Sequence, residues 1–90
     1  MFSFDFTDKL RIKLDKLSRK SPRLAKAVNK KIKQIIDNDN TTIDHYKNLR
    51  HNLSNLKRVH IDKHFVLTFY VDKEKKFILF HNVAHHDKIY

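Results

Sequence analysis

Histidine is the residue type in this sequence best suited to chemistry near neutral pH. His51, His60 and His64 surround one predicted hairpin, and His85 and His86 follow the last hydrophobic run. The reference pKa of histidine, about 6.5, leaves both protonation states populated near neutrality. A neutral imidazole can take a proton from a 2′-hydroxyl group of RNA, and a protonated imidazole can give one to the departing 5′-oxygen. The histidines therefore indicate metal-free cleavage of RNA as one hypothesis.

Cationic and aromatic side chains accompany these histidines. Lys57 and Arg58 lie in the first predicted strand of the hairpin, and their charges can stabilise a pentacoordinate phosphate. The ring of Tyr90 can stack on a base. By contrast, we expect His81 to pack within a strand and His45 to be solvated. The predicted catalytic residues are His51, Lys57, Arg58, His60, His64 and His86, and the predicted RNA-binding residues are His85 and Tyr90.

A metal site is the alternative explanation of the histidines. His60 and His64 are four positions apart, as in helical zinc sites, and His85 and His86 could add ligands. However, His60 and His64 fall at the end of a predicted strand and in a turn, and no Glu stands beside His60 as a general base. The neighbours His85 and His86 also point in different directions from either a helix or a strand. We therefore expect neither a metal nor another cofactor.

The charge balance favours a polyanionic partner. Lys and Arg number 20 and Asp and Glu number 10, which gives a formal net charge of +10. RNA, DNA, an acidic protein or an anionic membrane would be attracted to such a chain. No apolar run approaches the roughly 20 residues that span a bilayer, and the opening MFSFDF lacks the features of a signal peptide. We therefore expect no membrane partner and a cytoplasmic location.

Cysteine and glycine are absent, and each absence excludes a class of function. Without cysteine there is no disulfide, thiolate zinc site or cysteine nucleophile. Without glycine there is no glycine-rich loop of the kind that cradles nucleotide phosphates. A chain of 90 residues with no linker composition predicts a single domain, residues 1–90. Its core is small, so a site must be a groove or a surface cleft.

The first half of the chain predicts a strand followed by two helices. Phenylalanines alternate with polar residues near the start, as in a strand with one buried face. Thr7 can cap a helix that extends to about Lys20, because leucines recur at helical spacing in between. Ser21 and Pro22 then predict the start of a second helix. The polar residues DNDNTT, at 37–42, end its apolar stripe in a loop.

The second half predicts a β-meander. Three strand-like runs follow, at residues 56–61, 65–71 and 77–83. Their short polar connections favour antiparallel pairing. The order β-α-α-β-β-β predicts an α+β fold, in which a small antiparallel sheet carries an N-terminal helical hairpin on one face. If Val59 and Ile61 face the helices, alternation places Arg58 and His60 on the open face.

These features together resemble a known protein family over nearly the whole chain. The order of elements, the hairpin LKRVHIDKHFVLTFYV and the terminal AHHDKIY are similar to those of the RelE/ParE superfamily of toxin-antitoxin modules. Many members end with a glycine-led basic stretch, an acidic residue and a tyrosine. Here Ala84 replaces the glycine and His86 stands where an arginine is common.

The histidines resemble those of the YafQ-type branch of this superfamily. Its members carry a His before the hairpin, a His at the end of the first hairpin strand and a His near the C-terminus. The resemblance places these roles on His51, His60 and His86, with Tyr90 as the terminal aromatic residue. The turn position, which is acidic in that branch, is His64, so either His64 or nearby Asp62 would act there.

The resemblance implies an mRNA interferase that cuts mRNA in the ribosomal A site and is held inactive by a cognate antitoxin. We therefore hypothesise a metal-independent endoribonuclease that leaves a 2′,3′-cyclic phosphate. His60 or His51 would be the base and His86 the acid or phosphate ligand. Lys57 and Arg58 would stabilise the charge of the phosphate. The expected partners are the antitoxin, mRNA and the ribosome.

Two hypotheses from other functional classes stay open. A ParE-like member would inhibit DNA gyrase as a protein ligand, and the clustered histidines argue against it because such binding needs no proton transfer. A basic RNA-binding or ribosome-associated module without enzymatic activity would use the same open sheet. Growth arrest on induction would separate a toxin from the binding module, and DNA-damage signalling would indicate gyrase.

Overall fold

The chain forms a strand, two helices and then three further strands. The computed structural model describes residues 1–49 and 55–89. Its elements are β1 (Ser3–Phe6), α1 (Asp8–Lys20), α2 (Pro22–Ile36), the 3-10 turn η1 (Thr42–His45), β2 (Lys57–Ile61), β3 (Phe65–Asp72), β4 (Phe77–His85) and α3 (His86–Ile89). The α+β class and the β-α-α-β-β-β order predicted from the sequence are confirmed, and η1 and the short α3 are additions to them.

The four strands form one sheet in the order β1-β4-β3-β2. The predicted meander is confirmed, because β2, β3 and β4 pair antiparallel. β1 pairs in parallel with β4, with Phe6 beside Phe80, so the sheet is mixed and not wholly antiparallel as predicted. Alternation of buried side chains is the same in both kinds of pairing, and therefore it carries no information on strand direction.

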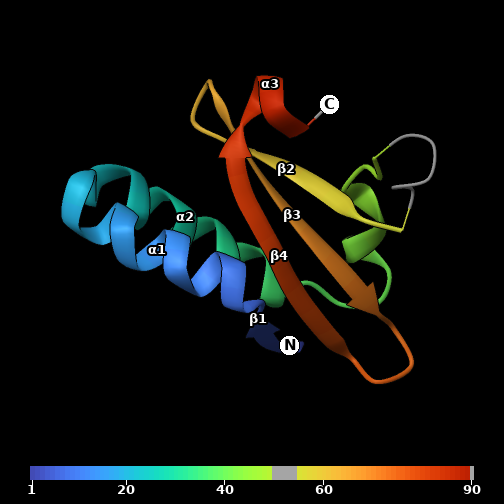
Figure 1. Ribbon diagram of the computed structural model, residues 1–90. Coiled ribbons are helices and arrows are strands. Elements are labelled where there is room, and N and C mark those ends of the chain that lie inside the picture. The colour runs from blue at the N-terminus through green and yellow to red at the C-terminus, as the bar shows by residue number, and fades with distance from the viewer. Residues whose placement is uncertain (50–54, 90) are drawn as a thin grey trace.

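The helices α1 and α2 form the predicted hairpin along one face of the sheet, drawn from blue to green in Figure 1. Thr7 caps α1, because its side chain accepts a hydrogen bond from the N–H of Leu10 at 3.2 Å. Ser21 precedes α2 but makes no side-chain capping bond, and its N–H donates to the carbonyl of Leu17 at 2.8 Å. The backbone of Ser21 therefore caps the C-terminus of α1. Pro22 starts α2, because its fixed φ suits the first helical position.

The apolar faces of the hairpin and the sheet enclose the core. The core includes Leu10, Val28, Ile32, Ile35 and Ile36 from the helices and Leu67, Phe69, Ile78, Phe80 and Val83 from the strands. The helical stripe is as predicted, except that Leu24 is only partly buried. None of the helices within residues 1–49 and 55–89 is long and apolar enough to cross a bilayer.

Replacement of Phe69 with Ala should lower the free energy of unfolding by about 3–5 kcal/mol, because loss of a buried ring leaves a cavity. Phe69 is fully buried, and the ring centroids of Tyr46 and Phe80 lie 5.6 and 5.9 Å from its own. Urea unfolding measures the change. Ile12→Ala, at an exposed position of α1, is the control and should shift stability by less than about 0.5 kcal/mol. An equal effect of the two substitutions would contradict this packing.

Candidate active site

The face of the sheet away from the helices carries two rows of candidate side chains. Val59 and Ile61 pack toward the core, so alternation places Arg58 and His60 on the opposite, open face as predicted. The His60 row consists of His60 on β2, Val66 on β3 and Ala84 on β4. The Arg58 row consists of Arg58, Thr68 and Asn82 on the same strands.

His60 and His86 form a stacked pair on this open face. Their ring centroids are 5.7 Å apart and their planes differ by 24°. His86 begins α3, which packs against β3 and β4, and its N–H donates to the carbonyl of His64 at 2.7 Å. Because β3 separates β2 from β4, the ring of His86 must reach back over Val66 to stack on His60. Val66 is accordingly 0% exposed although it points away from the helices.

His64 and His85 form a second stacked pair, and this pair lies on the helix side of the sheet. Their ring centroids are 5.8 Å apart and their planes differ by 5°. His85 pairs in register with Phe65, whose ring meets it edge-on at 5.7 Å and packs against the core. The structure therefore divides four of the five predicted histidines into two pairs. Asp87 is near one member of each, with carboxylate oxygens 3.6 Å from Nδ1 of His85 and 3.7 Å from Nδ1 of His86.

Among the described residues, Lys57 is a predicted site residue that is not brought to the His60–His86 pair. The ammonium group of Lys57 donates to the carbonyl of Tyr46 at 3.1 Å and to Oδ1 of Asn48 at 3.2 Å, so it is held by the segment before β2. His51 and Tyr90 lie outside the described residues. Of the two residues considered for the acidic turn position, His64 stacks on the helix side.

Asp62, the other of these two, also lies on the helix side. It starts the turn between β2 and β3 with a φ of 59°, a left-handed conformation that Asp tolerates better than most residues. It lines a hollow beside Arg23 and Ala27 of α2. Within the described part of the chain, no group of three or more His, Asp or Glu side chains is arranged to hold a metal ion.

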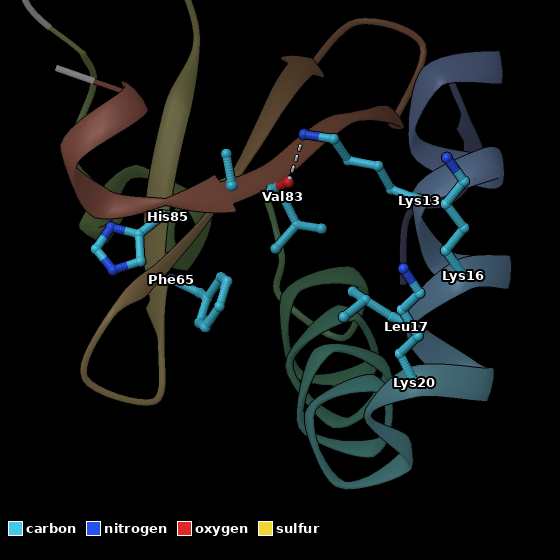
Figure 2. Close-up of a pocket in the computed structure, with 8 residues that line it drawn as sticks. Lys13, Lys16, Leu17, Lys20, Phe65, Val83 and His85 are labelled. Carbon is cyan, nitrogen blue, oxygen red and sulfur yellow. Dashed lines mark hydrogen bonds between the residues drawn. The ribbon is translucent and has the colours of Figure 1, made fainter.

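A hollow of about 360 Å³ opens between α1 and the end of the sheet. Figure 2 shows three lysines of α1 beside Leu17, opposite Phe65, Val83 and His85 of the strands. The lysines are Lys13, Lys16 and Lys20. One of them, Lys13, donates from its ammonium group to the carbonyl of Val83 at 3.0 Å. The hollow therefore combines an apolar floor with a cationic rim, on the opposite side of the sheet from the His60–His86 pair.

His81 is a candidate that the sequence analysis assigned to packing alone. Thr68 pairs with Asn82 and Phe69 with Phe80, so His81 is an extra residue in β4, a β-bulge. Its Nδ1 lies 3.1 Å from Oγ1 of Thr68, and burial, followed by the charges of lysines in α1, lowers its pKa. The sequence carried a signal of the bulge, because the core positions 78, 80 and 83 are spaced by two and then by three residues.

Two relatives match the chain along its length, although no family model matches it. A protein of Methanocaldococcus jannaschii that carries the name of a RelE toxin, RelE4, is 44% identical over 90 residues, which are 100% of this chain and 92% of the relative. A protein of Methanosarcina mazei is 38% identical over 90 residues, with 100% of both chains covered.

Solved structures of toxins share the fold. The RelBE2 toxin-antitoxin complex of Mycobacterium tuberculosis matches with a TM-score of 0.73 and 22% identity, over 94% of this chain and 98% of that chain. YafQ of Escherichia coli gives 0.74 and 12% identity, over 100% and 99%. The YoeB–YefM complex of Staphylococcus aureus gives 0.75 and 17% identity, over 96% and 98%.

The fold and these relatives define the class of protein as a toxin of a toxin-antitoxin module. The chain belongs to the RelE/ParE superfamily, as its closing residues and element order predicted, and within it to the RelE family. Its histidines on the open face thus lie in a toxin fold.

His81 should titrate below the ordinary histidine value of 6.5, because burial and the charges of Lys9 and Lys13 lower its pKa. A group whose pKa is lower in the folded than in the unfolded chain stabilises the fold at any pH above its unfolded-state pKa. This stability is lost as the pH falls from the unfolded-state pKa through the folded-state pKa. NMR of the imidazole protons measures the midpoint directly. In urea unfolding, His81→Gln should lose less stability than the native chain between about pH 7 and about pH 5. A midpoint of 6.5 or above would contradict the assignment.

Proposed function

We propose that this toxin is a metal-independent endoribonuclease that cuts mRNA in the A site of translating ribosomes, in the cytoplasm. The observation that carries the proposal is the stacked His60–His86 pair, next to the row of Arg58 on the open face. Two adjacent imidazoles can supply a proton acceptor and a proton donor at one place, and a guanidinium group can stabilise phosphate charge. The net charge of +10 supports binding to RNA.

In the proposed reaction the 2′-oxygen of the RNA attacks the adjacent phosphorus. An imidazole accepts the 2′-hydroxyl proton as the O2′–P bond forms, and Arg58 stabilises the charge on the non-bridging oxygens. The P–O5′ bond breaks, and His86 gives a proton to the departing 5′-oxygen. The products are a 2′,3′-cyclic phosphate and a 5′-hydroxyl group. His51 as the base and Tyr90 as the stacking group stay predictions from the sequence.

The cognate antitoxin is the proposed regulatory partner. Two of the similar solved structures are complexes of a toxin with its antitoxin, RelBE2 and YoeB–YefM. In this chain the hollow beside α1 fits an acidic segment that carries an aliphatic or aromatic anchor, because Leu17, Phe65 and Val83 line its floor and lysines its rim. Carboxylates of the antitoxin would pair with these lysines while the anchor fills the hollow.

Replacement of His86 with Ala should lower cleavage by roughly a hundredfold or more, the scale of one general acid or base. Primer extension on a defined mRNA, with and without translating ribosomes, measures the cuts. EDTA added to the ribosome-free reaction tests for a metal requirement. His45→Ala, at an exposed position in η1, is the matched control and should cleave like the native chain.

Each outcome of this experiment separates the functional hypotheses. Cuts that need ribosomes and vanish in His86→Ala support the interferase. Cuts in free RNA that resist EDTA indicate a nuclease that acts without the ribosome. If folded protein cuts nothing, a non-catalytic function replaces the proposal. DNA-damage signalling in cells would then indicate gyrase as the target.

The double substitution Lys16→Glu with Lys20→Glu should weaken antitoxin binding by tenfold or more, because like charges would then face the acidic segment. Isothermal titration with the purified cognate antitoxin measures the Kd. The matched control is Lys26→Glu with Lys33→Glu, which makes the same change of net charge at exposed positions of α2. Equal weakening by both pairs would assign the effect to net charge alone and contradict docking at the hollow.

A further inference from the structure

The bulge in β4 turns the imidazole of His81 toward the open face of the sheet. Leu67 and Phe69 are in the core, so the intervening Thr68 and the following Tyr70 point away from the helices. The ring of His81 meets both of these side chains. Its Nδ1 is 3.1 Å from Oγ1 of Thr68, and the ring of Tyr70 lies edge-on with a centroid distance of 5.7 Å. His81 therefore lies on the same face as the His60–His86 pair.

The start of α1 holds this bulge in place. The hydroxyl group of Thr7 donates to the carbonyl of His81 at 2.6 Å and accepts from the N–H of Leu10 at 3.2 Å. The N–H of Thr7 donates to the carbonyl of Phe80 at 3.0 Å. The residue that caps the helix therefore also fixes the backbone that carries the imidazole, and His81 has a defined position.

One tautomer of His81 satisfies both contacts of the Thr68 hydroxyl group. The hydroxyl group has one hydrogen, and a bond from it to the carbonyl of Asn82 at 3.3 Å uses this hydrogen. Both contacts are made at once only when Nδ1–H of His81 donates to Oγ1 at 3.1 Å, and in this tautomer Nε2 keeps its lone pair. Burial and the charges of Lys9 and Lys13 lower the pKa of His81, and this favours the neutral form. A neutral imidazole with a free Nε2 is suited to accept a proton.

His81 lies across Thr68 from Arg58, the cation that would hold the phosphate. Thr68 is 1% exposed, and its row neighbours Arg58 and Asn82 flank it on the two adjacent strands. The Nε atom of Arg58 is itself buried. His81 precedes Asn82, so it lies at the β4 end of the Arg58 row. The His60 row is the next one along the strands, about 6.6 Å away.

We propose that His81 is a further catalytic residue of this toxin and acts as the base that removes the 2′-hydroxyl proton. The inference rests on the proposed RNA cleavage. The proton passes from O2′ to Nε2 of His81 as the O2′–P bond forms, and His86 gives a proton to O5′ as the P–O5′ bond breaks. In-line displacement places the attacking and leaving oxygens on opposite sides of phosphorus, and His81 and His86 lie in different rows of the open face. His60 then orients His86 by stacking and contacts the phosphate.

A substrate with a modified leaving group distinguishes a residue that acts as the general base from one that acts as the general acid. The test uses a short synthetic mRNA, programmed on ribosomes, with sulfur in place of the bridging 5′-oxygen at the cleavage site. A thiolate departs without a proton, so loss of the acid is harmless with this RNA whereas loss of the base is not. His86→Ala should therefore recover to within about tenfold of the native rate. His81→Asn should stay at least about a hundredfold slower on both substrates.

His81→Asn is chosen because its amide can still donate to Oγ1 of Thr68. His45→Asn is the control, since it makes the same exchange at an exposed position in η1.

A second measurement needs no variant. In the native chain the acidic limb of kcat/KM against pH should fall at the NMR midpoint of His81. The titratable and charged groups that face His81 are Lys9 and Lys13 of α1 and Tyr70 of β3, and Arg58 of β2 lies beyond Thr68.

The outcomes separate this inference from the proposed function. If the native chain cuts RNA and His81→Asn cuts within about threefold of it, or is rescued by the sulfur substrate, His81 is not the base and only this inference fails. If the acidic limb of kcat/KM falls at a pH other than the NMR midpoint of His81, this inference also fails while the proposed function stands. If the native chain cuts neither substrate, both proposals fall. Loss of cleavage in His81→Asn without rescue, together with coinciding midpoints, supports the inference.

Discussion

Each candidate side chain on the open face takes its position from the pairing of β3 with its two neighbours. β3 is central in the sheet, and the four consecutive residues from Val66 to Phe69 are buried. A slip of one residue in this pairing would turn Leu67 and Phe69 out of the core, at a cost of several kcal/mol. The core thus fixes the register. The register in turn places His60 beside Val66, where the ring of His86 can reach it.

The one irregularity in that register is also a consequence of packing. β1 pairs with the N-terminal part of β4 and ends at Phe6, and Thr7 then caps the start of α1. The bulge lies at this point. It keeps Phe80 and Val83 on the core face although they are three positions apart, and it places His81 on the open face. A single extra residue therefore serves the core and adds a titratable group to the open face.

The sheet also separates two kinds of surface. The open face carries imidazoles and the guanidinium of Arg58, which are groups that act on phosphates. The helix side carries an apolar hollow with lysines on its rim, which suits a protein partner. The C-terminal end of β4 joins the two, because His85 and His86 are adjacent in sequence but stack on opposite sides of the sheet. Only a few residues of backbone therefore connect the two surfaces.

Local patterns in the sequence determined much of this architecture. The alternation of Phe2, Phe4 and Phe6, the cap at Thr7 and the proline that starts α2 depend on neighbouring residues, so they predicted the elements and their order. Alternation along β2 likewise predicted that Arg58 and His60 lie on the open face. The closing AHHDKIY, compared with known toxins, identified the superfamily.

Only the tertiary structure decided how the elements combine. Four features depend on contacts between distant residues. They are the parallel pairing of β1, the division of four histidines into two pairs, the retention of Lys57 by the segment before β2 and the position of His81 on the open face. Sequence spacing carries no measure of such contacts, because they are set by strand order and by the fit of the helices on the sheet. Local sequence patterns therefore specified the elements and the side chains on each face, and the packing of the core decided which of these side chains contact one another.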